Sequence, residues 1–513
     1  MSKSVTTTTF SIAQALANFD ISIDEMLTNA MTNDSRTVKA GDIFCAVIGS
    51  ELDGRQYIDQ AVANGASLVI AQCQHQQQHG KLLFKAIDKN SPKVVVVQFY
   101  QLEQHLFTLA QLYYQQPQQH MKVVGITGTN GKTSTAITLA KLLTACQQKA
   151  AVIGTIGAGV MPKLKTIANT TPGATETLAL INDFAAQDVD VLAMEVSSHA
   201  LAQKRVLPEL FDIAVFTNLS RDHLDFHSSI DDYADTKFSL FGGKTGQIAI
   251  LNGDDSYAQT WLSNEANLVG RALIVFGRDP QIAQLYKNGY VVAKNLKHHS
   301  AGISFDLITH VGAAKVNSPL LGDFNVDNLL AAIAVMLSLE FSLTTISQVI
   351  SEVSPAPGRM ESFSGQGKPL AIVDYAHTPD GLACALQAAK KHCQAKLWLV
   401  FGCGGDRDKG KRGEMGAIAE QYADHIILTN DNPRTEAPEL IVSDILAGCK
   451  KAEKITIILN REQALKSVFA HAKAEDCIVF AGKGHEDYII VGTEKQPYNE
   501  RQRVQDFYQG AVL

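Results

Sequence analysis

The sequence has no pair of cysteines at the short spacing that zinc clusters and redox motifs use. Its eight cysteines are scattered along the chain, at Cys45, Cys73, Cys146, Cys384, Cys393, Cys403, Cys449 and Cys477. Because no C-x-x-C pair occurs among them, neither a zinc cluster nor a disulfide framework is indicated. The pattern favours free thiols in a reducing cytoplasm.

Long hydrophobic runs and blocks of one charge are also missing. No run of about 18 apolar residues occurs, and the N-terminal stretch MSKSVTTTTFSIAQAL has no long apolar segment. These absences argue against a membrane span and against export. The net charge is -7 and no Lys/Arg block offsets it, which argues against electrostatic binding of nucleic acid.

What remains is an ordinary globular composition. Hydrophobic residues make up 46% and charged residues 19% of the 513 residues, which favours a soluble enzyme or binding protein. At roughly 100 to 200 residues per domain, three domains are expected. Pro117 and the SPAPGR segment at Ser354–Arg359 interrupt the pattern, so we predict domains at residues 1–118, 119–355 and 356–513.

Short apolar runs that alternate with helix-like segments predict the fold class. Runs such as KVVGIT, DVLAMEV, LWLVFG and CIVFA each end in a turn signal. This rhythm is typical of α/β units with mostly parallel sheets. Between Gly289 and Leu321 apolar and polar residues alternate instead, which predicts a few antiparallel strands added to the central sheet.

The strongest local signal is the glycine loop GITGTNGKTS at Gly125–Ser134, between a predicted strand and a predicted helix. A strand, a glycine turn and a helix N-terminus aim backbone N–H groups at phosphate, Lys132 adds positive charge, and Thr133 offers a hydroxyl to Mg²⁺. Ile126 stands where the strict Walker pattern needs glycine, so the loop is a variant, and a plain helix-capping turn is the alternative. The nucleotide-binding candidates are Gly128, Thr129, Asn130, Gly131, Lys132, Thr133 and Ser134.

Two further segments start where apolar strands end: MEVSSHAL at Met194–Leu201 and TNLSRDHLDFH at Thr217–His227. Ligands of open α/β sheets gather at the carboxyl ends of strands, so Glu195 and His223 are candidates for a metal site beside the glycine loop. Each alone is more often a cap or a structural group. Lys237, in YADTKFSLF, would on its own be interpreted as an exposed helix lysine.

These segments, in this order, resemble the Mur ligases. The resemblance also rests on NDSRTVKAGDIFCAVIG, GDFNVDN, GRME, VDYAHTPDG, FGCGGDRDKGKR, DNPR and GKGHEDY, and it covers nearly the whole chain. It implies an N-terminal α/β domain that holds UDP, a central P-loop ATPase-like domain with a mostly parallel sheet, and a C-terminal Rossmann-like domain that brings an amino acid.

The resemblance also implies roles for individual residues. Ser35 matches a UDP contact, Asn328 an adenine contact and Arg359 a phosphate contact. Lys237 matches a lysine that family members carry as a carbamate, an anion able to ligate Mg²⁺. The implied catalytic residues are Lys132, Lys237, His223 and Glu195, and the metal ligands are Thr133, Glu195, His223 and Lys237. The implied contacts to a muramoyl-dipeptide are Asn169, Thr170, Thr171, Ser197, Gln203 and Arg205.

The implied activity is ATP-dependent amide formation in peptidoglycan precursor synthesis. ATP would phosphorylate the D-glutamate γ-carboxylate of UDP-N-acetylmuramoyl-L-alanyl-D-glutamate, and the amine of meso-2,6-diaminopimelate would attack the acyl phosphate. Mg²⁺ and Lys132 would neutralise the approaching anions. His377, in VDYAHTPDG, is a candidate phosphate contact, and a strand-end cap is the equal alternative. The partners are small molecules, with no nucleic acid and no membrane span, and a cytoplasmic monomer is expected.

The loop TNDNPRTE at Thr429–Glu436 is the predicted amino-acid site. It follows the strand HIILT, and Pro433 stiffens the turn that presents Arg434. A guanidinium can bind the distal carboxylate of diaminopimelate with two parallel hydrogen bonds. The blander alternative is a solvated turn in which Arg434 pairs with Glu436. By resemblance, the diaminopimelate contacts are Arg407, Asp431, Asn432, Pro433, Arg434, Gly482 and Glu486, with Glu486 suited to the distal ammonium.

Three other functions remain open at this point. A non-catalytic nucleotide switch would explain the glycine loop but not the later motifs. A folylpolyglutamate synthase resembles the central and C-terminal parts but lacks a UDP-binding domain of the kind that the NDSR stretch suggests. A Mur ligase that adds lysine is the nearest alternative.

Overall fold

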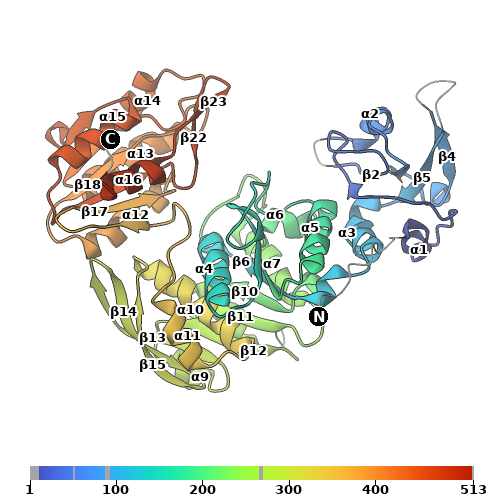
Figure 1. The fold of residues 1–513 in the computed structure, drawn as a ribbon, viewed down its shortest axis with the longest axis horizontal. Helices are drawn as coiled ribbons and strands as arrows, with labels where there is room; N and C mark the ends of the chain where they lie inside the picture. The colour runs from blue at the N-terminus through green and yellow to red at the C-terminus, as the bar shows by residue number, and fades with distance from the viewer. Residues whose placement is uncertain (1–10, 50–51, 87–92, 265–267, 269, 511–513) are drawn as a thin grey trace. The chain divides into compact units, whose positions relative to one another are not determined.

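The computed structural model describes residues 11–49, 52–86, 93–264, 268 and 270–510 (Figure 1). The chain forms two compact units. The first contains residues 1–132, 147–250 and 257–273, and the second contains residues 133–146, 251–256 and 274–513.

The first unit begins with a five-stranded sheet in the order β1-β2-β3-β5-β4. Its strands are β1 (Met31–Thr32), β2 (Ile43–Ala46), β3 (Leu68–Cys73), β4 (Leu82–Lys85) and β5 (Val94–Tyr100). The accompanying helices are α1 (Ile12–Ala17), α2 (Ile58–Ala63) and α3 (Leu102–Tyr113). All pairs are parallel except β4 with β5. Every residue of β2 and β3 is buried, as expected for the interior strands of a parallel sheet.

Six more strands, lying mostly in the first unit, take the order β11-β10-β6-β9-β7-β8. They are β6 (Lys122–Thr127), β7 (Ala150–Gly154), β8 (Gly157–Val160), β9 (Val191–Glu195), β10 (Ile213–Phe216) and β11 (Ile248–Asn252). The helices are α5 (Ala174–Ala186), α6 (Ser198–Ala202), α7 (Ile230–Phe238) and α8 (Ser256–Ser263). Because β10, β6, β9 and β7 run parallel, the loops after them gather at one sheet edge.

Helix α4 (Lys132–Ala145), which follows the glycine loop in sequence, belongs to the second unit from Thr133 onward. The next strands of this unit are β12 (Ala272–Gly277), β13 (Tyr290–His299), β14 (Gly302–Thr309) and β15 (Gly312–Ser318). Helix α9 (Ile282–Leu285) lies between β12 and β13, and α10 (Asp323–Ser338) and α11 (Leu343–Ile350) follow β15. Strand β14 pairs antiparallel with both β13 and β15. This confirms the antiparallel strands predicted between Gly289 and Leu321.

The C-terminal part of the second unit is a six-stranded sheet in the order β16-β17-β21-β18-β19-β20. The strands are β16 (Glu361–Phe363), β17 (Leu370–Asp374), β18 (Leu397–Phe401), β19 (His425–Leu428), β20 (Ile455–Ile457) and β21 (Cys477–Ala481). Only β16 is antiparallel to its neighbour. The helices are α12 (Pro379–His392), α13 (Gly410–Tyr422), α14 (Pro438–Leu446), α15 (Arg461–His471) and α16 (Glu500–Tyr508).

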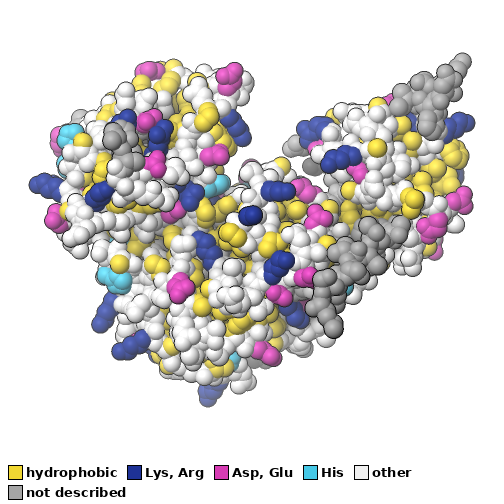
Figure 2. All heavy atoms as spheres, in the orientation of Figure 1, with side chains coloured by type: hydrophobic (Ala, Val, Ile, Leu, Met, Phe, Trp, Pro, Cys, Tyr) yellow, Lys and Arg dark blue, Asp and Glu magenta, His cyan; other side chains and the backbone are white. Residues whose placement is uncertain are grey.

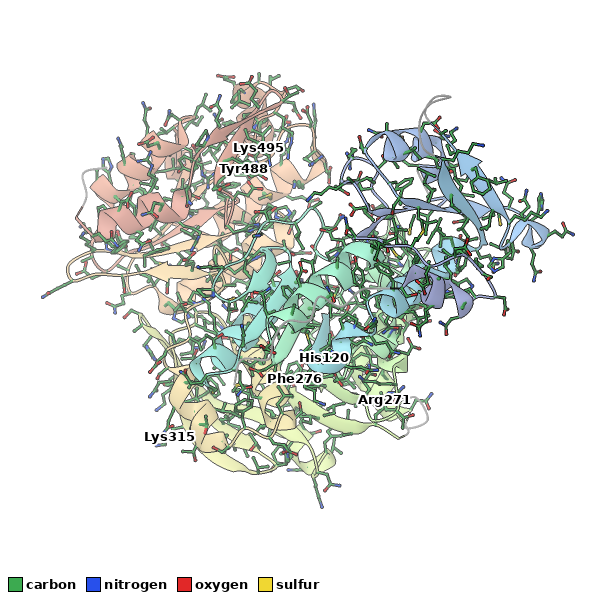
Figure 3. The ribbon with its side chains drawn as sticks, turned by 45° about the vertical axis from the view of Figure 1, so that its right-hand side comes forward. His120, Arg271, Phe276, Lys315, Tyr488 and Lys495 are labelled. Carbon is green, nitrogen blue, oxygen red and sulfur yellow. The ribbon has the colours of Figure 1, made fainter. Side chains whose placement is uncertain are left out.

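Apolar residues cover both faces of this C-terminal sheet. Ile372 belongs to a cluster with residues of α12, α13 and α14, whereas its neighbours Ala371 and Val373 belong to a cluster with residues of α15 and α16. A hairpin of β22 (Tyr488–Val491) and β23 (Glu494–Pro497) stands beside the sheet. In the hairpin, Lys495 Nζ lies 4.0 Å from the Tyr488 ring centroid (Figure 3). A parallel sheet with helices on both faces is the predicted Rossmann-like arrangement.

The α/β class and the three-domain plan are therefore confirmed. The three large sheets lie within residues 31–100, 122–318 and 361–481, and the boundaries near 118 and 355 stay predictions that fall between them. None of the helices in the described ranges is long and apolar enough to cross a membrane. On the face shown in Figure 2, Lys and Arg side chains lie singly or in small groups among neutral and acidic ones.

Candidate active site

The glycine loop between β6 and α4 needs glycine at two positions. Gly128 has φ +150° and Gly131 has φ +87°, conformations that other residues rarely adopt. A Cβ atom on Gly128 would lie 2.0 Å from Thr217 Oγ1, just beyond β10. The loop is therefore packed against the end of the neighbouring strand, and a side chain at Gly128 would push it away.

Hydrogen bonds from the segment after β10 hold the loop in place. Thr129 N donates to Asn218 O (2.8 Å), and Thr217 Oγ1 donates to Asn130 O (2.6 Å). The Lys132 side chain points back toward the loop, where its Nζ donates to Gly128 O (2.8 Å) and Thr129 O (2.9 Å). The ammonium therefore lies over the loop, where an entering phosphate would meet it.

Glu195 ends β9, next to β6 in the sheet, with Ile126 and Glu195 in register. Its side chain is buried, and it accepts hydrogen bonds from Thr155 N at Oε1 (2.8 Å) and from Thr155 Oγ1 at Oε2 (3.2 Å). A Cβ atom on Gly154 would lie 2.2 Å from Glu195 Oε1. Gly154 therefore leaves the space in which the carboxylate sits.

Lys237 is 1% exposed, so the interpretation as an exposed helix lysine is wrong. Its Nζ donates to Gly128 O (2.9 Å) and lies 4.5 Å from the Tyr233 ring centroid. Burial, and then the nearby charge of Lys132, lower the pKa of Lys237 well below its ordinary value. A lower pKa increases the fraction of neutral amine, the form of lysine that reacts with CO₂.

His223 lies farther out, with 44% of its side chain exposed. Its Nε2 is 3.5 Å from Asp222 Oδ2, and its ring is 4.9 Å from that of His199. Among the described residues, no group of three or more His, Cys, Asp or Glu side chains is placed to hold a metal ion. The four predicted Mg²⁺ ligands therefore stay a prediction. Glu195 and Thr133 offer the oxygen atoms that Mg²⁺ prefers, and Lys237 would do so only as a carbamate.

The predicted dipeptide contacts partly converge beside Glu195. Ser197 N donates to Thr171 Oγ1 (3.0 Å), and Arg205 Nη1 donates to Thr171 O (3.4 Å). Thr170 Oγ1 lies 3.0 Å from Thr155 Oγ1. By contrast, Asn169 and Gln203 are exposed.

Three other predicted contacts lie elsewhere in the fold. In the N-terminal sheet region, Ser35 Oγ donates to Gln60 Oε1 (2.8 Å). In the second unit, Asn328 Oδ1 accepts from Thr135 Oγ1 (3.2 Å). The Arg359 guanidinium lies 4.8 Å from the Tyr375 ring centroid. Arg359 Nε is buried and has no hydrogen-bond partner among the described residues, a pattern that points to a ligand or a water.

His377 is exposed, and its Nδ1 donates to Tyr375 O (2.9 Å). This contact fits the alternative that we gave for it, a cap at the end of β17. Its role as a phosphate contact stays a prediction.

The loop after β19 presents Arg434 from a fixed backbone. Arg434 has φ +51°, its N–H donates to Ile490 O (3.0 Å), and its carbonyl accepts from Gly492 N (2.8 Å). The guanidinium donates to Gly405 O (2.9 Å). Glu436 instead forms two hydrogen bonds of 2.9 Å with Arg412, so the alternative in which Arg434 pairs with Glu436 is wrong.

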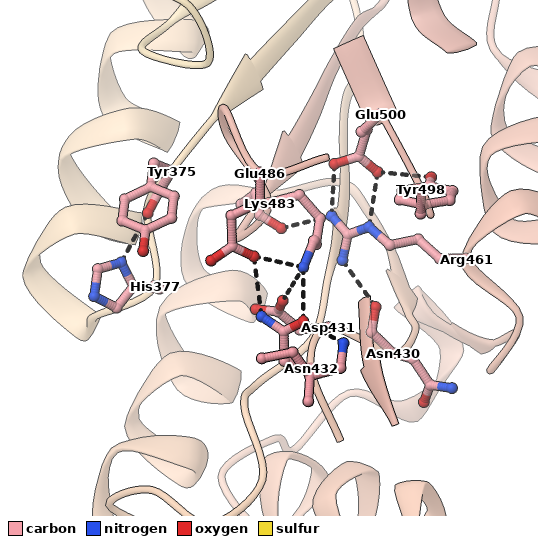
Figure 4. Close-up of polar contacts among 12 residues, drawn as sticks. Tyr375, His377, Asn430, Asp431, Asn432, Arg461, Lys483, Glu486, Tyr498 and Glu500 are labelled. Atoms are coloured by element: carbon pink, nitrogen blue, oxygen red, sulfur yellow. Dashed lines mark hydrogen bonds and ion pairs between the residues drawn. The ribbon is translucent and has the colours of Figure 1, made fainter. Parts of the chain in front are cut away.

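Asn432 and Glu486 are in direct contact (Figure 4). Asn432 Nδ2 donates to Glu486 Oε2 (3.0 Å). Gly482 has φ +105°, and a Cβ atom there would lie 2.9 Å from Asp431 Oδ2. Pro433 is buried beside them, whereas Arg407 is exposed, with its Nη1 3.5 Å from Asp406 O.

Sequence reasoning missed Lys483, which lies between these residues. Its side chain is fully buried, and Nζ donates to Glu486 Oε2 (2.6 Å), Asn432 Oδ1 (2.9 Å) and Asp431 Oδ1 (3.2 Å) (Figure 4). The signal was present in GKGHEDY, where a lysine is flanked by two glycines at a strand end. Only the fold shows that this lysine points inward.

Comparisons with known proteins place the chain in one family. Family models match three segments: the Mur ligase family catalytic domain at residues 28–114, the Mur ligase middle domain at 126–336, and the Mur ligase glutamate ligase domain at 358–484. A curated relative from Haemophilus influenzae (strain 86-028NP), UDP-N-acetylmuramoyl-L-alanyl-D-glutamate–2,6-diaminopimelate ligase, is 41% identical over 477 residues, covering 93% of this chain and 95% of its own.

Solved structures give the same result. A structure of UDP-N-acetylmuramoyl-L-alanyl-D-glutamate–2,6-diaminopimelate ligase is 32% identical, with a TM-score of 0.68, over 97% of this chain and 99% of the other. A D-alanyl-D-alanyl-adding ligase from Acinetobacter baumannii is 17% identical, with a TM-score of 0.65, over 98% of this chain and 100% of the other. At that identity the second structure supports the fold alone.

Proposed function

The chain belongs to the Mur ligase family, and we propose that it joins meso-2,6-diaminopimelate to the D-glutamate γ-carboxylate of UDP-N-acetylmuramoyl-L-alanyl-D-glutamate, using ATP. The proposal is supported by the place of Arg434, Asn432 and Glu486 in the loops after β19 and β21, where they would form an amino-acid pocket, in a chain that is 41% identical to a ligase named for diaminopimelate. The pocket offers a guanidinium and a carboxylate, the pair of charges that complements a distal carboxylate and ammonium.

The first half of the reaction transfers a phosphoryl group from ATP to a carboxylate. Two anions must approach each other, so positive charge and positioning supply most of the rate. The ammonium of Lys132, which lies over the glycine loop, is suited to the ATP phosphates. Thr171, Ser197 and Arg205 form the group of side chains suited to the muramoyl-dipeptide.

Mg²⁺ would supply further positive charge to the phosphates when bound. Thr133, Glu195, His223 and the carbamate form of Lys237 are the residues that would hold it. Carbamate formation joins the neutral Lys237 amine to CO₂ through a new N–C bond and releases one proton. The lowered pKa of Lys237, caused mainly by burial, supports this step because the neutral amine is the nucleophile.

The second half of the reaction is attack by the amine of the amino acid on the acyl phosphate. The new amide bond forms as the phosphate leaves, and the amine loses a proton. In the C-terminal pocket, Arg434 is suited to the distal carboxylate of diaminopimelate and Glu486 to its distal ammonium. Lysine has no distal carboxylate, so Arg434 favours diaminopimelate over the lysine-adding alternative.

A folylpolyglutamate synthase activity is less well supported. The family model at residues 28–114 covers the N-terminal sheet, the part of the chain that we assign to UDP. A cytoplasmic location and a monomeric state remain predictions of this proposal.

The test is release of ADP by the purified protein with ATP, Mg²⁺, UDP-N-acetylmuramoyl-dipeptide and meso-diaminopimelate. We expect release to need all of these components. The variant Lys132→Ala is the control, and we expect its kcat to fall by about 10²-fold or more while the protein stays folded. ADP release without an amino acid, or near-normal turnover by the variant, would contradict the proposal.

A further inference from the structure

We propose that Lys483 is a positioning residue that makes the amino-acid pocket select a distal zwitterion over a distal ammonium. This inference rests on the proposed function and deepens it. Lys483 follows Gly482 directly after β21, and its side chain is fully buried. Its ammonium contacts Asn432 and Glu486, two of the predicted diaminopimelate contacts.

All three hydrogen atoms of the Lys483 ammonium have an acceptor. Nζ donates to Glu486 Oε2 (2.6 Å), Asn432 Oδ1 (2.9 Å) and Asp431 Oδ1 (3.2 Å). It therefore joins the loop after β19 to the loop after β21. A buried ammonium with three oxygen partners is held in one place, and it holds those partners in turn.

The first consequence concerns the Asn432 amide. Its oxygen accepts from Lys483 Nζ and from Ile490 N (2.9 Å), while its nitrogen donates to Glu486 Oε2 (3.0 Å). Two donors on one side and a carboxylate on the other allow only one orientation of the amide. Lys483 thus fixes which polar groups of Asn432 and Glu486 face a substrate.

The second consequence concerns charge. Lys483 lies within salt-bridge distance of both carboxylates of the pocket, Asp431 and Glu486, whose side chains are 8% and 14% exposed. A substrate ammonium must share Glu486 with this internal cation, so an ammonium by itself gains little. A distal carboxylate bound by Arg434 adds an attraction that Lys483 does not weaken.

Removal of Lys483 should change how strongly the site attracts each charged group of the substrate. The two carboxylates would lose their cation, and burial of unpaired charge is costly, so any ammonium that reaches them would be bound more tightly. Both substrates carry a distal ammonium and would share this gain, but only diaminopimelate also carries a distal carboxylate, which the unpaired Asp431 and Glu486 carboxylates would repel. We therefore expect the preference for diaminopimelate over lysine to fall in a variant without the Lys483 ammonium.

The experiment measures kcat/KM for meso-diaminopimelate and for L-lysine in the full-length wild type and in Lys483→Ala. We expect the ratio of the two values to fall by at least about tenfold, the change produced by loss of about 1.4 kcal/mol of discrimination. The change in the ratio should come from the KM values for the two amino acids, and the KM for ATP should stay unchanged within about twofold. Propylammonium should restore the ratio by refilling the space, and propanol, its neutral counterpart, should not.

Three results would overturn the proposal, because each indicates a purely structural lysine. They are an unchanged ratio of the two kcat/KM values, equal rises in the KM for ATP and for the amino acid, and equal rescue by propanol. If Lys483→Ala does not fold, Lys483→Met keeps the apolar stem and must show the same fall in the ratio. Failure of the wild type to use meso-diaminopimelate would instead contradict the proposed function itself.

Discussion

At the scale of single residues, burial decides what a charged side chain can do. Lys237 lies on α7, where the sequence alone suggests a solvated lysine, yet its amine is enclosed against Gly128 and Tyr233. An isolated buried ammonium is unfavourable, so burial favours loss of the proton from Lys237. The neutral amine is the form from which a carbamate can be made.

We predict that Lys237→Ala is nearly inactive and that a small carboxylic acid or bicarbonate partly restores its activity. Lys237→Arg should stay inactive, because a guanidinium cannot form a carbamate. The carbamate itself is checked in the wild type by a ¹³C signal after incubation with ¹³C-labelled bicarbonate. Full activity of Lys237→Arg, or no labelled carbon on an active wild type, would refute the role.

A second prediction at this scale concerns Arg434. We expect Arg434→Ala to raise the KM for meso-diaminopimelate and to cost about 2 to 5 kcal/mol in kcat/KM, the range for truncation of one partner of a buried charge pair. Lysine should lose much less, because it has no distal carboxylate. The measurement is kcat/KM for both amino acids, and equal proportional losses would mean that Arg434 supports only the fold.

Single residues also mark the limit of what the sequence could predict. Glycine at positions 128 and 131 was readable from the loop motif, since backbone geometry alone requires it. The hydrogen-bond partner of Arg434 could not be predicted from the sequence. Glu436 is only two residues away, yet it bonds to Arg412 on α13 instead. Lys483 was missed for the same reason: contacts between loops depend on the whole sheet.

At the scale of elements, the site depends on loops that follow parallel strands. The sequence predicted most of these strands, because short apolar runs that end in turn signals have few other interpretations. It also predicted that the loops would share an edge. The Glu195 contacts depend on β7, which the motifs did not identify: the space for the carboxylate is left by Gly154 at the end of that strand.

We therefore predict that Gly154→Ala loses activity without losing the fold. The added methyl group would meet the movable end of Glu195 at 2.2 Å, so the carboxylate should shift while the strand stays in place. A displacement of about 1 Å can cost of the order of 10²-fold in rate.

Gly242→Ala is the matched control, since a Cβ atom there meets nothing within 4 Å. The readouts are kcat and the Tm of both variants against the wild type. Normal kcat in Gly154→Ala would show that the position of Glu195 is not critical. A large drop in its Tm would show that the strand, and not the carboxylate, moved.

At the scale of the whole molecule, a buried contact in the second unit uses a neutral histidine. His392, at the end of α12, accepts from Gly322 N at Nε2 (3.1 Å) and donates from Nδ1 to His299 O (2.8 Å). Both bonds are possible only for the neutral imidazole. Burial is the main cause that lowers the pKa of His392, and the nearby His298 lowers it further while Asp323 raises it.

This arrangement predicts lower stability in mild acid. The folded pKa of His392 lies below the unfolded value of about 6.5, so its contribution is complete above that pH and is lost as pH falls through the folded pKa. The loss is at most about 1.4 kcal/mol per pH unit. His392→Gln keeps an acceptor and a donor but does not titrate, so its Tm should fall less than that of the wild type between pH 7 and pH 5. Parallel Tm curves would contradict this role.

The three-domain plan was the easiest feature to predict at this scale, because chain length favoured it and the breaks at Pro117 and SPAPGR suggested where to divide the chain. The central claim, that this chain makes one particular amide bond, is tested most directly by the mass of its product. After incubation with ATP, Mg²⁺, UDP-N-acetylmuramoyl-L-alanyl-D-glutamate and an equal mixture of meso-diaminopimelate and L-lysine, we expect a product heavier than the dipeptide by one diaminopimelate less one water, with one ADP per product. A product that contains lysine in preference, or no ligated product while ATP is consumed, would contradict the account.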